Sequence, residues 1–171
     1  MCLLEQAFFY IHKMSASQQQ ELYTAETIFW GSSVLDAPQF TALVTVDEWT
    51  QFVQIIRDDV QIYPYNYQQS SLEHFVPRVT LLRSSSTLRA CAYLGSDHIA
   101  VKEDQCFRWL ALHEMAHFIV PALPDLHGWR FVNVYAQMIA RWVGDAERDA
   151  FLHIARAFNV QDTPLERVAV M

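Results

Sequence analysis

The segment from Phe107 to Val120 carries only two charged residues, Arg108 and Glu114. A helix built from this segment is apolar on nearly all its faces, so we expect it inside the core rather than on the surface. We expect it to begin after a cap at Asp104 and to end near Val120, because Pro121 cannot continue a helix. The rest of the chain must therefore fold around this helix.

The same segment contains the motif HEMAH, from His113 to His117. Histidines four positions apart are one helical turn apart, so both imidazoles can face one ion. Glu114 then flanks the ion, as the general base does in metalloproteases with this spacing. The motif predicts Zn²⁺ ligation by the two histidines and catalysis by Glu114. The alternative is a pair of core histidines hydrogen-bonded to the backbone, with Glu114 in an ion pair.

A catalytic zinc site usually has three protein ligands and one open position. We prefer His127 as the third ligand, because a connector ending in Leu-His-Gly can turn back and present an imidazole from the start of the next helix. Gly128 then allows close backbone approach, and Phe131 anchors that helix beneath the site. Carboxylates that otherwise cap and solvate the last helix are the alternative ligands, namely Asp145, Glu147 and Asp149.

Other side chains are candidates for contact with substrate or with an oxyanion. His98 precedes the motif helix on an expected strand that could line a cleft, and the remaining candidates are Tyr93, Arg130 and Tyr135. We favour simple packing for the two tyrosines, and a solvated helix face for Arg130, over these roles.

Hydrophobic patterning predicts helices and strands on both sides of the motif. We expect helices at Gln19–Trp30, ended by Gly31, at Glu48–Arg57, capped by Asp47, from about His127 to Val143, and from a cap at Asp145 to about Phe158. A strand is expected at Phe40–Val46, and a meander of three strands at Arg78–Arg83, Leu88–Leu94 and His98–Lys102.

These elements predict an α+β fold of zincin-like type. A small antiparallel or mixed sheet packs on the buried active-site helix, with further helices at the N- and C-terminal ends. The length of 171 residues and the 52% hydrophobic content suit one domain over residues 1–171, with loosely ordered ends at 1–14 and 161–171.

Charge and cysteine content restrict the partners and the compartment. A net charge of -7 with only 12 Lys and Arg argues against nucleic-acid binding, which needs clustered cations. The odd set of Cys2, Cys91 and Cys106 argues against a disulfide framework and favours a reducing cytoplasm. No apolar run reaches the length of a membrane span, and the first residues lack the basic region of a signal peptide.

HEMAH followed by HGWRF resembles the HExxH and HGxxF pair of SprT-like and related minimal zincin metallopeptidases, in which the second motif supplies the third zinc ligand. Over Ser17 to Val160 the chain is also similar to a group of small actinobacterial metallohydrolases, which share its size and its polar first helix. The resemblance implies catalysis by Glu114 and zinc ligation by His113, His117 and His127.

The chain departs from the SprT-like pattern in two respects. It lacks a cysteine zinc ribbon, which argues against DNA-linked proteolysis. Trp129 and Arg130 replace the proline and glutamate that are frequent in the second motif, so the rim of the site is expected to differ.

The expected function is therefore zinc-dependent hydrolysis of a peptide bond, with the peptide or protein substrate lying along an exposed strand such as His98 to Lys102. A zinc-stabilised binding or regulatory module without turnover is the first alternative. A structural protein without metal is the second.

Overall fold

The structure is a computed structural model that describes residues 18–32, 35, 37–62, 78–94, 96, 98–120 and 127–162. The predicted N-terminal extension and residues 163–171 of the predicted loose end lie outside the described residues. Gln161 and Asp162 are described and belong to no helix or strand. No helix in the described ranges has the length and apolarity that crossing a membrane requires.

The order of elements is that of an α+β protein, as the sequence predicts. A helix over residues 18–30 comes first. The elements after it are α2 (Pro38–Thr41), α3 (Val46–Ile62), β1 (Arg78–Leu81), β2 (Ala90–Tyr93), β3 (His98–Val101), the 3-10 helix η2 (Glu103–Gln105), α4 (Arg108–Ile119), α5 (Trp129–Trp142) and α6 (Asp145–Ala157).

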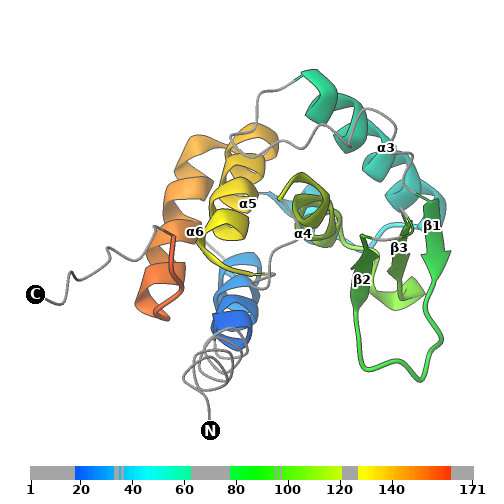
Figure 1. The fold of residues 1–171 in the computed structure, drawn as a ribbon, viewed down its shortest axis with the longest axis horizontal. Helices are drawn as coiled ribbons and strands as arrows, with labels where there is room; N and C mark the ends of the chain where they lie inside the picture. The colour runs from blue at the N-terminus through cyan, green and yellow to red at the C-terminus, as the bar shows by residue number, and fades with distance from the viewer. Residues whose placement is uncertain are drawn as a thin grey trace, which may run out of the picture.

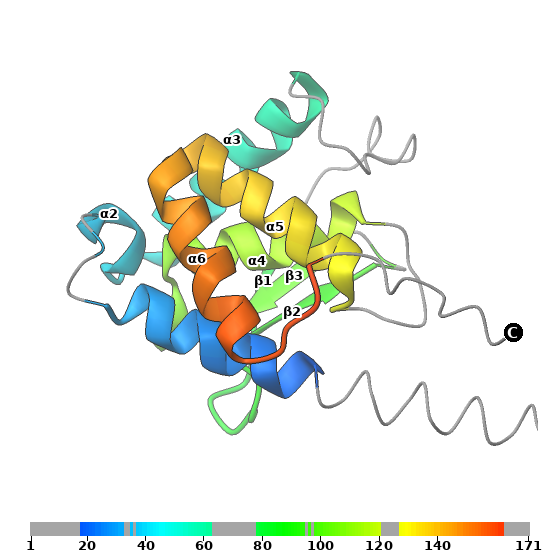
Figure 2. The ribbon, with the colours of Figure 1, turned by 90° about the vertical axis from the view of Figure 1, so that its left-hand side faces the viewer.

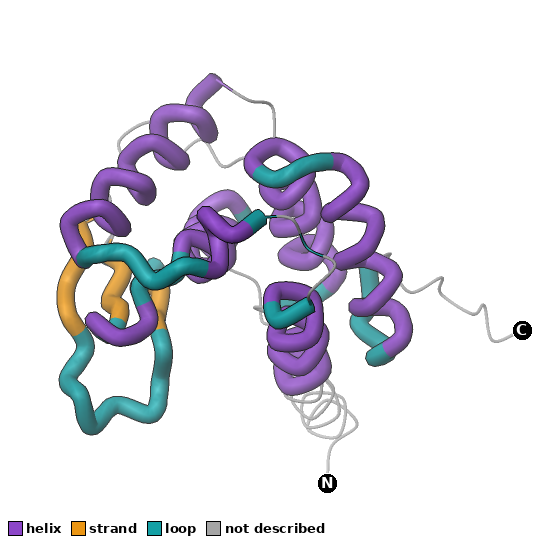
Figure 3. The backbone as a smooth tube through the Cα atoms, turned by 180° about the vertical axis from the view of Figure 1, so that it is seen from behind, coloured by secondary structure: helices purple, strands orange, loops and turns teal. Residues whose placement is uncertain are grey.

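The helix α4, which carries HEMAH, lies at the centre of the fold. Figure 1 shows the sheet on one side of it, α5 and then α6 on the other, and α3 across the top. Figure 2 shows α5 and α6 packed side by side with the 18–30 helix below them. From behind, the sheet and α6 stand at opposite ends of the molecule (Figure 3). All residues of α4 except Arg108 and His117 are buried, which confirms the prediction of a core helix.

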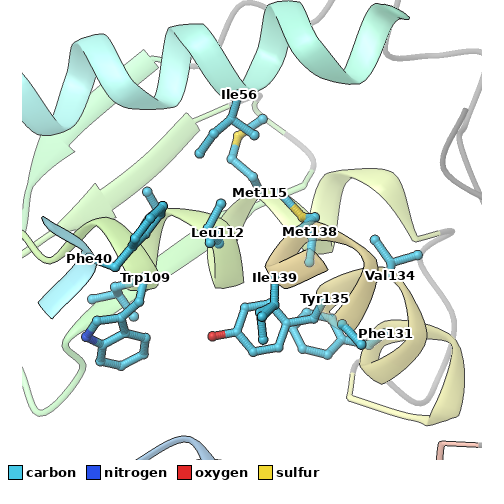
Figure 4. Close-up of a cluster of buried hydrophobic side chains, with 14 of the residues drawn as sticks. Phe40, Ile56, Trp109, Leu112, Met115, Phe131, Val134, Tyr135, Met138 and Ile139 are labelled. Atoms are coloured by element: carbon cyan, nitrogen blue, oxygen red, sulfur yellow. The ribbon is translucent and has the colours of Figure 1, made fainter. Parts of the chain in front are cut away.

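The core forms where α4 meets α3 and α5. In Figure 4, Met115 of α4 lies between Ile56 of α3 and Met138 of α5. On α5 the buried side chains recur at helical spacing, so one apolar face packs inward while polar residues face out. They are Phe131, Val132, Val134, Tyr135, Ala136, Met138 and Ile139.

The sheet is mixed rather than a meander. Its strand order is β1-β3-β2, with β1 parallel to β3 and β2 antiparallel to β3. The hairpin of β2 and β3 is as expected, but β1 adds to the far side of β3 instead of pairing with β2. The strand β3 is therefore central, which corrects the prediction that His98 to Lys102 forms an exposed edge.

Four local predictions were wrong where tertiary contacts or caps decided the backbone. At 40–46, Pro38 starts the short helix α2, and Leu43 alone forms a bridge, with Phe107. That bridge keeps Phe107 extended, so α4 begins at Arg108 rather than after Asp104.

The caps of α3 and α6 also differ from the prediction. Thr45 caps α3 in place of Asp47: the Thr45 N–H and Oγ1 donate to the Glu48 carboxylate at 2.9 and 2.8 Å, and the Glu48 N–H donates back to Thr45 Oγ1. At α6 the capping residue is Gly144, and Asp145 is the first helical residue.

Candidate metal centre

Three histidines meet between α4 and the start of α5. His113 and His117 lie one turn apart on α4, and His127 lies just before α5. One ring nitrogen from each comes within 4.8 Å of the other two, a spacing that could hold a metal ion. Nε2 of His113 lies 3.3 Å from Nε2 of His127. The three predicted ligands are thus brought to one point.

A carboxylate behind His113 orients its ring. The Nδ1 of His113 donates to Oε1 of Glu26 at 2.6 Å, and both side chains are buried. This bond puts the proton on Nδ1 and leaves Nε2 free to face an ion, the arrangement found behind many metal-binding histidines. Glu26 also accepts from the Tyr135 hydroxyl, which itself accepts from Trp30 Nε1 at 2.9 Å. The three supporting residues come from the 18–30 helix and α5, so those helices and α4 are tied together behind the site.

The other sides of the cluster are also held in place. The centroid of the Phe131 ring lies 4.9, 4.5 and 4.9 Å from the ring centroids of His113, His117 and His127. This agrees with its predicted place beneath the site. The side chain of Gln18 donates to the backbone oxygen of His127 at 2.9 Å. The imidazoles are therefore fixed by packing and hydrogen bonds, as a rigid ligand set requires.

The protonation states suit metal binding. Burial and the neighbouring imidazoles lower the pKa of His117 well below its ordinary value, although this ring keeps some solvent contact. Burial and His113 lower the pKa of His127 to about 3. Burial by itself would lower the pKa of His113, but the charge and hydrogen bond of Glu26, with the charge of Glu114, raise it. Two of the rings are thus neutral at pH 7 and ready to donate a lone pair.

Glu114 lies beside the histidine cluster and belongs to a different set of contacts. It is only 5% exposed, and the backbone N–H of Ala92 on β2 donates to its carboxylate. Burial, opposed by His113 and reinforced by Glu26, raises its pKa to about 7. A carboxyl group with this pKa can both take and return a proton near neutral pH.

A pocket of about 420 Å³ opens beside Glu114 and His113. It lies between the 18–30 helix, residues 87–90 and the first turn of α4. Tyr23 forms part of the wall of this pocket, and its ring centroid lies 5.8 Å from that of His113 and 5.4 Å from that of His127. The side-chain amide of Gln19 donates to the Tyr23 hydroxyl at 2.9 Å, and burial is the main cause that raises the pKa of this phenol.

The other sequence-predicted candidates make contacts of their own. The rings of Tyr93 and His98 stack with their centroids 4.3 Å apart, and Ser96 Oγ lies 2.8 Å from His98 Nδ1. Arg130 lies over the ring of Trp129 at 5.3 Å. Tyr135 is fully buried behind Glu26, where its hydroxyl supports the site instead of facing a substrate.

The alternative carboxylate ligands on α6 are not in the cluster. Asp145 and Asp149 pair with Arg148 at 2.7 and 2.9 Å and are largely exposed. Glu147 lies in the first turn of α6, where it folds back toward Gly144.

Sequence reasoning missed Glu26 and Tyr23, both on the 18–30 helix. A signal for Glu26 was present: it shares the buried stripe of Leu22, Ala25 and Phe29, where an unpaired charge would be costly. No comparable signal marks Tyr23, because its position beside the imidazoles depends on how the 18–30 helix packs against α4.

In comparisons with known proteins, no family model, curated protein sequence or solved structure matches this chain. The geometry of the site therefore carries the functional argument.

Proposed function

We propose that this protein is a zinc-dependent hydrolase that cleaves peptide bonds, with Glu114 as the general base and His113, His117 and His127 as the metal ligands. The observation that carries the proposal is the meeting of three imidazole nitrogens within 4.8 Å of one another, beside a buried carboxylate outside the ligand set.

The residues present fit zinc. Imidazole is a preferred ligand of this ion, and catalytic zinc sites commonly use three protein ligands and leave one position open. Glu26 supplies the outer carboxylate that usually orients a ligating histidine. When bound, zinc lowers the pKa of a coordinated water to about 7 and polarises a carbonyl oxygen.

The chain's own residues then move the protons. The carboxylate of Glu114 accepts a proton from the attacking water, and the resulting carboxylic acid returns it to the departing amine. The Ala92 N–H holds the carboxylate in place through this exchange. The ring of Tyr23 lies beside two of the proposed ligand histidines and in the wall of the pocket, and its hydroxyl is proposed to stabilise the charge that develops on the carbonyl oxygen.

The edge of β2 that faces away from β3, which pairs with no other strand of the described residues, supports a peptide substrate. The Lys102 N–H donates to the backbone oxygen of Arg89 at 2.9 Å. In the antiparallel ladder the backbone N–H and C=O groups of Arg89, Cys91 and Tyr93 therefore point toward β3. The backbone groups of Ala90 and Ala92 consequently point away from the sheet. Ala92 N–H reaches Glu114, and Ala90 lines the pocket. Because the Ala92 N–H is held by Glu114, an extended peptide would pair with this edge through the backbone of Ala90 and the Ala92 carbonyl and pass the catalytic carboxylate. The strand β2 therefore replaces β3 as the proposed docking strand.

The substitution Glu114→Gln tests the proposal. Gln keeps the size and the Ala92 contact but cannot take a proton, so peptide hydrolysis should fall by about 10²- to 10⁴-fold with zinc still bound. Glu147→Gln on α6 is the matched control and should leave the rate unchanged. Zinc-bound wild type with no activity on a broad peptide mixture would instead support a binding or regulatory module.

A further inference from the structure

Several large apolar side chains that are exposed to solvent gather at the pocket beside Glu114. Among the described residues seven large hydrophobic side chains are exposed, and three of them line this one pocket. They are Tyr23, Ile28 and Leu88, which are 40%, 44% and 49% exposed. Ile28 comes from the 18–30 helix and Leu88 from the segment before β2, so two distant parts of the chain bring apolar surface together here.

The remaining lining adds both apolar and polar groups, the latter including Gln20, Thr87 and Arg89. Trp109 and Leu110, from the first turn of α4, add buried apolar surface. Thr24 and Thr27 also line the pocket, and their hydroxyl groups donate to the backbone oxygens of Gln20 and Tyr23. The two acidic groups that reach the pocket are engaged, since Glu26 accepts from His113 and Glu114 accepts from Ala92. Arg89 is exposed at the pocket and disfavours a cationic guest.

The position of the pocket determines what can enter it. His113 and Glu114 line it directly, so a carbonyl placed at the metal centre has its neighbouring residues at the pocket. Successive residues of an extended peptide advance by about 3.3 Å, so the side chain that enters belongs to a residue close to the cleaved bond. Burying a large apolar side chain against these walls removes apolar surface from water and so favours binding.

We propose that this pocket receives a large apolar side chain, such as Leu, Ile, Met or Phe, from a residue within two positions of the bond that is cleaved. The inference rests on the proposed peptidase function and adds its substrate class: apolar peptide segments, which folded proteins expose mainly when they unfold.

Cleavage-site profiling tests the proposal. Zinc-loaded wild type is incubated with a mixture of peptides of known sequence, and the cut sites are identified by mass spectrometry. We expect one position within two residues of the cut to be enriched in large apolar residues and depleted in Lys and Arg. Cleavage with no side-chain preference near the cut would overturn the pocket assignment while leaving the peptidase function intact.

A matched pair of substitutions assigns the preference to this pocket. Ile28→Glu places a charge in the pocket, and Ile55→Glu places one at a 54% exposed isoleucine on α3. Ile28→Glu should reduce kcat/KM for apolar substrates by about 10- to 100-fold and shift the preferred residue toward Lys and Arg. Ile55→Glu should do neither. Equal effects of the two substitutions would contradict the proposal.

A binding measurement separates failure of the pocket from failure of the peptidase. Fluorescently labelled Ala-Ala-Phe-Ala-Ala should bind zinc-loaded Glu114→Gln protein at least about tenfold tighter than the same peptide with Gly or Lys at the centre. Adding Ile28→Glu should remove that difference. If this preference appears but wild type cleaves no peptide, the pocket assignment stands and the peptidase does not. Absence of the preference overturns the assignment.

Discussion

The histidine cluster and the pocket beside it differ in how their side chains are used. In the cluster each imidazole packs on Phe131, and His113 is locked through Glu26 to Tyr135 and Trp30. In the pocket, large apolar side chains stay exposed to solvent. A metal centre requires ligands that are held in a fixed geometry. A substrate site instead leaves apolar side chains exposed to water until the substrate covers them. The contrast agrees with the two proposed roles, a closed region that holds an ion and an open region that admits a peptide.

Glu114 lies at the boundary between the two regions. Because its carboxyl group is buried, the free energy of unfolding of the metal-free protein should depend on pH. Its pKa in the folded chain is about 7, above the ordinary 4.5, so between these values the folded state binds more protons than the unfolded state. The contribution of this group to stability is therefore lost as pH rises through that interval. Glu114→Gln removes the effect, so the metal-free variant should gain up to roughly 3 kcal/mol over metal-free wild type between pH 4.5 and pH 8.

Urea unfolding of both proteins across that pH range measures the difference. A difference in unfolding free energy that stays constant with pH would mean that Glu114 is not desolvated as described. The boundary between the closed and open regions would then lie elsewhere.

Glu26 tests whether the cluster depends on its outer support. Glu26→Gln keeps a hydrogen-bond acceptor for His113 but removes the charge that orients the ring, so zinc affinity should fall by about 10- to 100-fold. Competition with a chromophoric chelator measures this affinity. Glu21→Gln, on the same helix and outside the described cluster, is the control. If Glu26→Gln bound zinc as tightly as wild type, the histidine cluster would not depend on a carboxylate behind His113.

Tyr23 belongs to the open region, and its loss should affect turnover without affecting the metal. Tyr23→Phe keeps the ring against His113 and His127 but removes the hydroxyl, so kcat should fall by about tenfold with zinc affinity unchanged. Steady-state kinetics combined with metal titration separates the two effects. A parallel loss of zinc would assign Tyr23 to the closed region instead.

The sequence allowed prediction of what is local to the motif. The helical spacing of His113 and His117, the apolar surround and the turn before His127 were enough to predict a buried helix and a third histidine beside it. Each of these inferences depends on contacts between residues close in the chain.

What depends on distant packing could not be predicted in the same way. Glu26 contacts His113 across 87 positions, and the pairing of β1 with β3 has no local signature. The expected edge strand was wrong for that reason, because β1 covers the side of β3 that faces away from β2. Turn chemistry correctly predicted the hairpin of β2 and β3 but gave no information about which neighbour β1 would select.

The metal content of the purified protein tests the central claim most directly. Elemental analysis of protein prepared without a metal-affinity tag should find about one equivalent of zinc in wild type and in Glu147→Ala. His127→Ala should retain far less, because two imidazoles alone hold the ion weakly. Wild type without zinc, or zinc lost from Glu147→Ala and kept by His127→Ala, would contradict a three-histidine zinc centre.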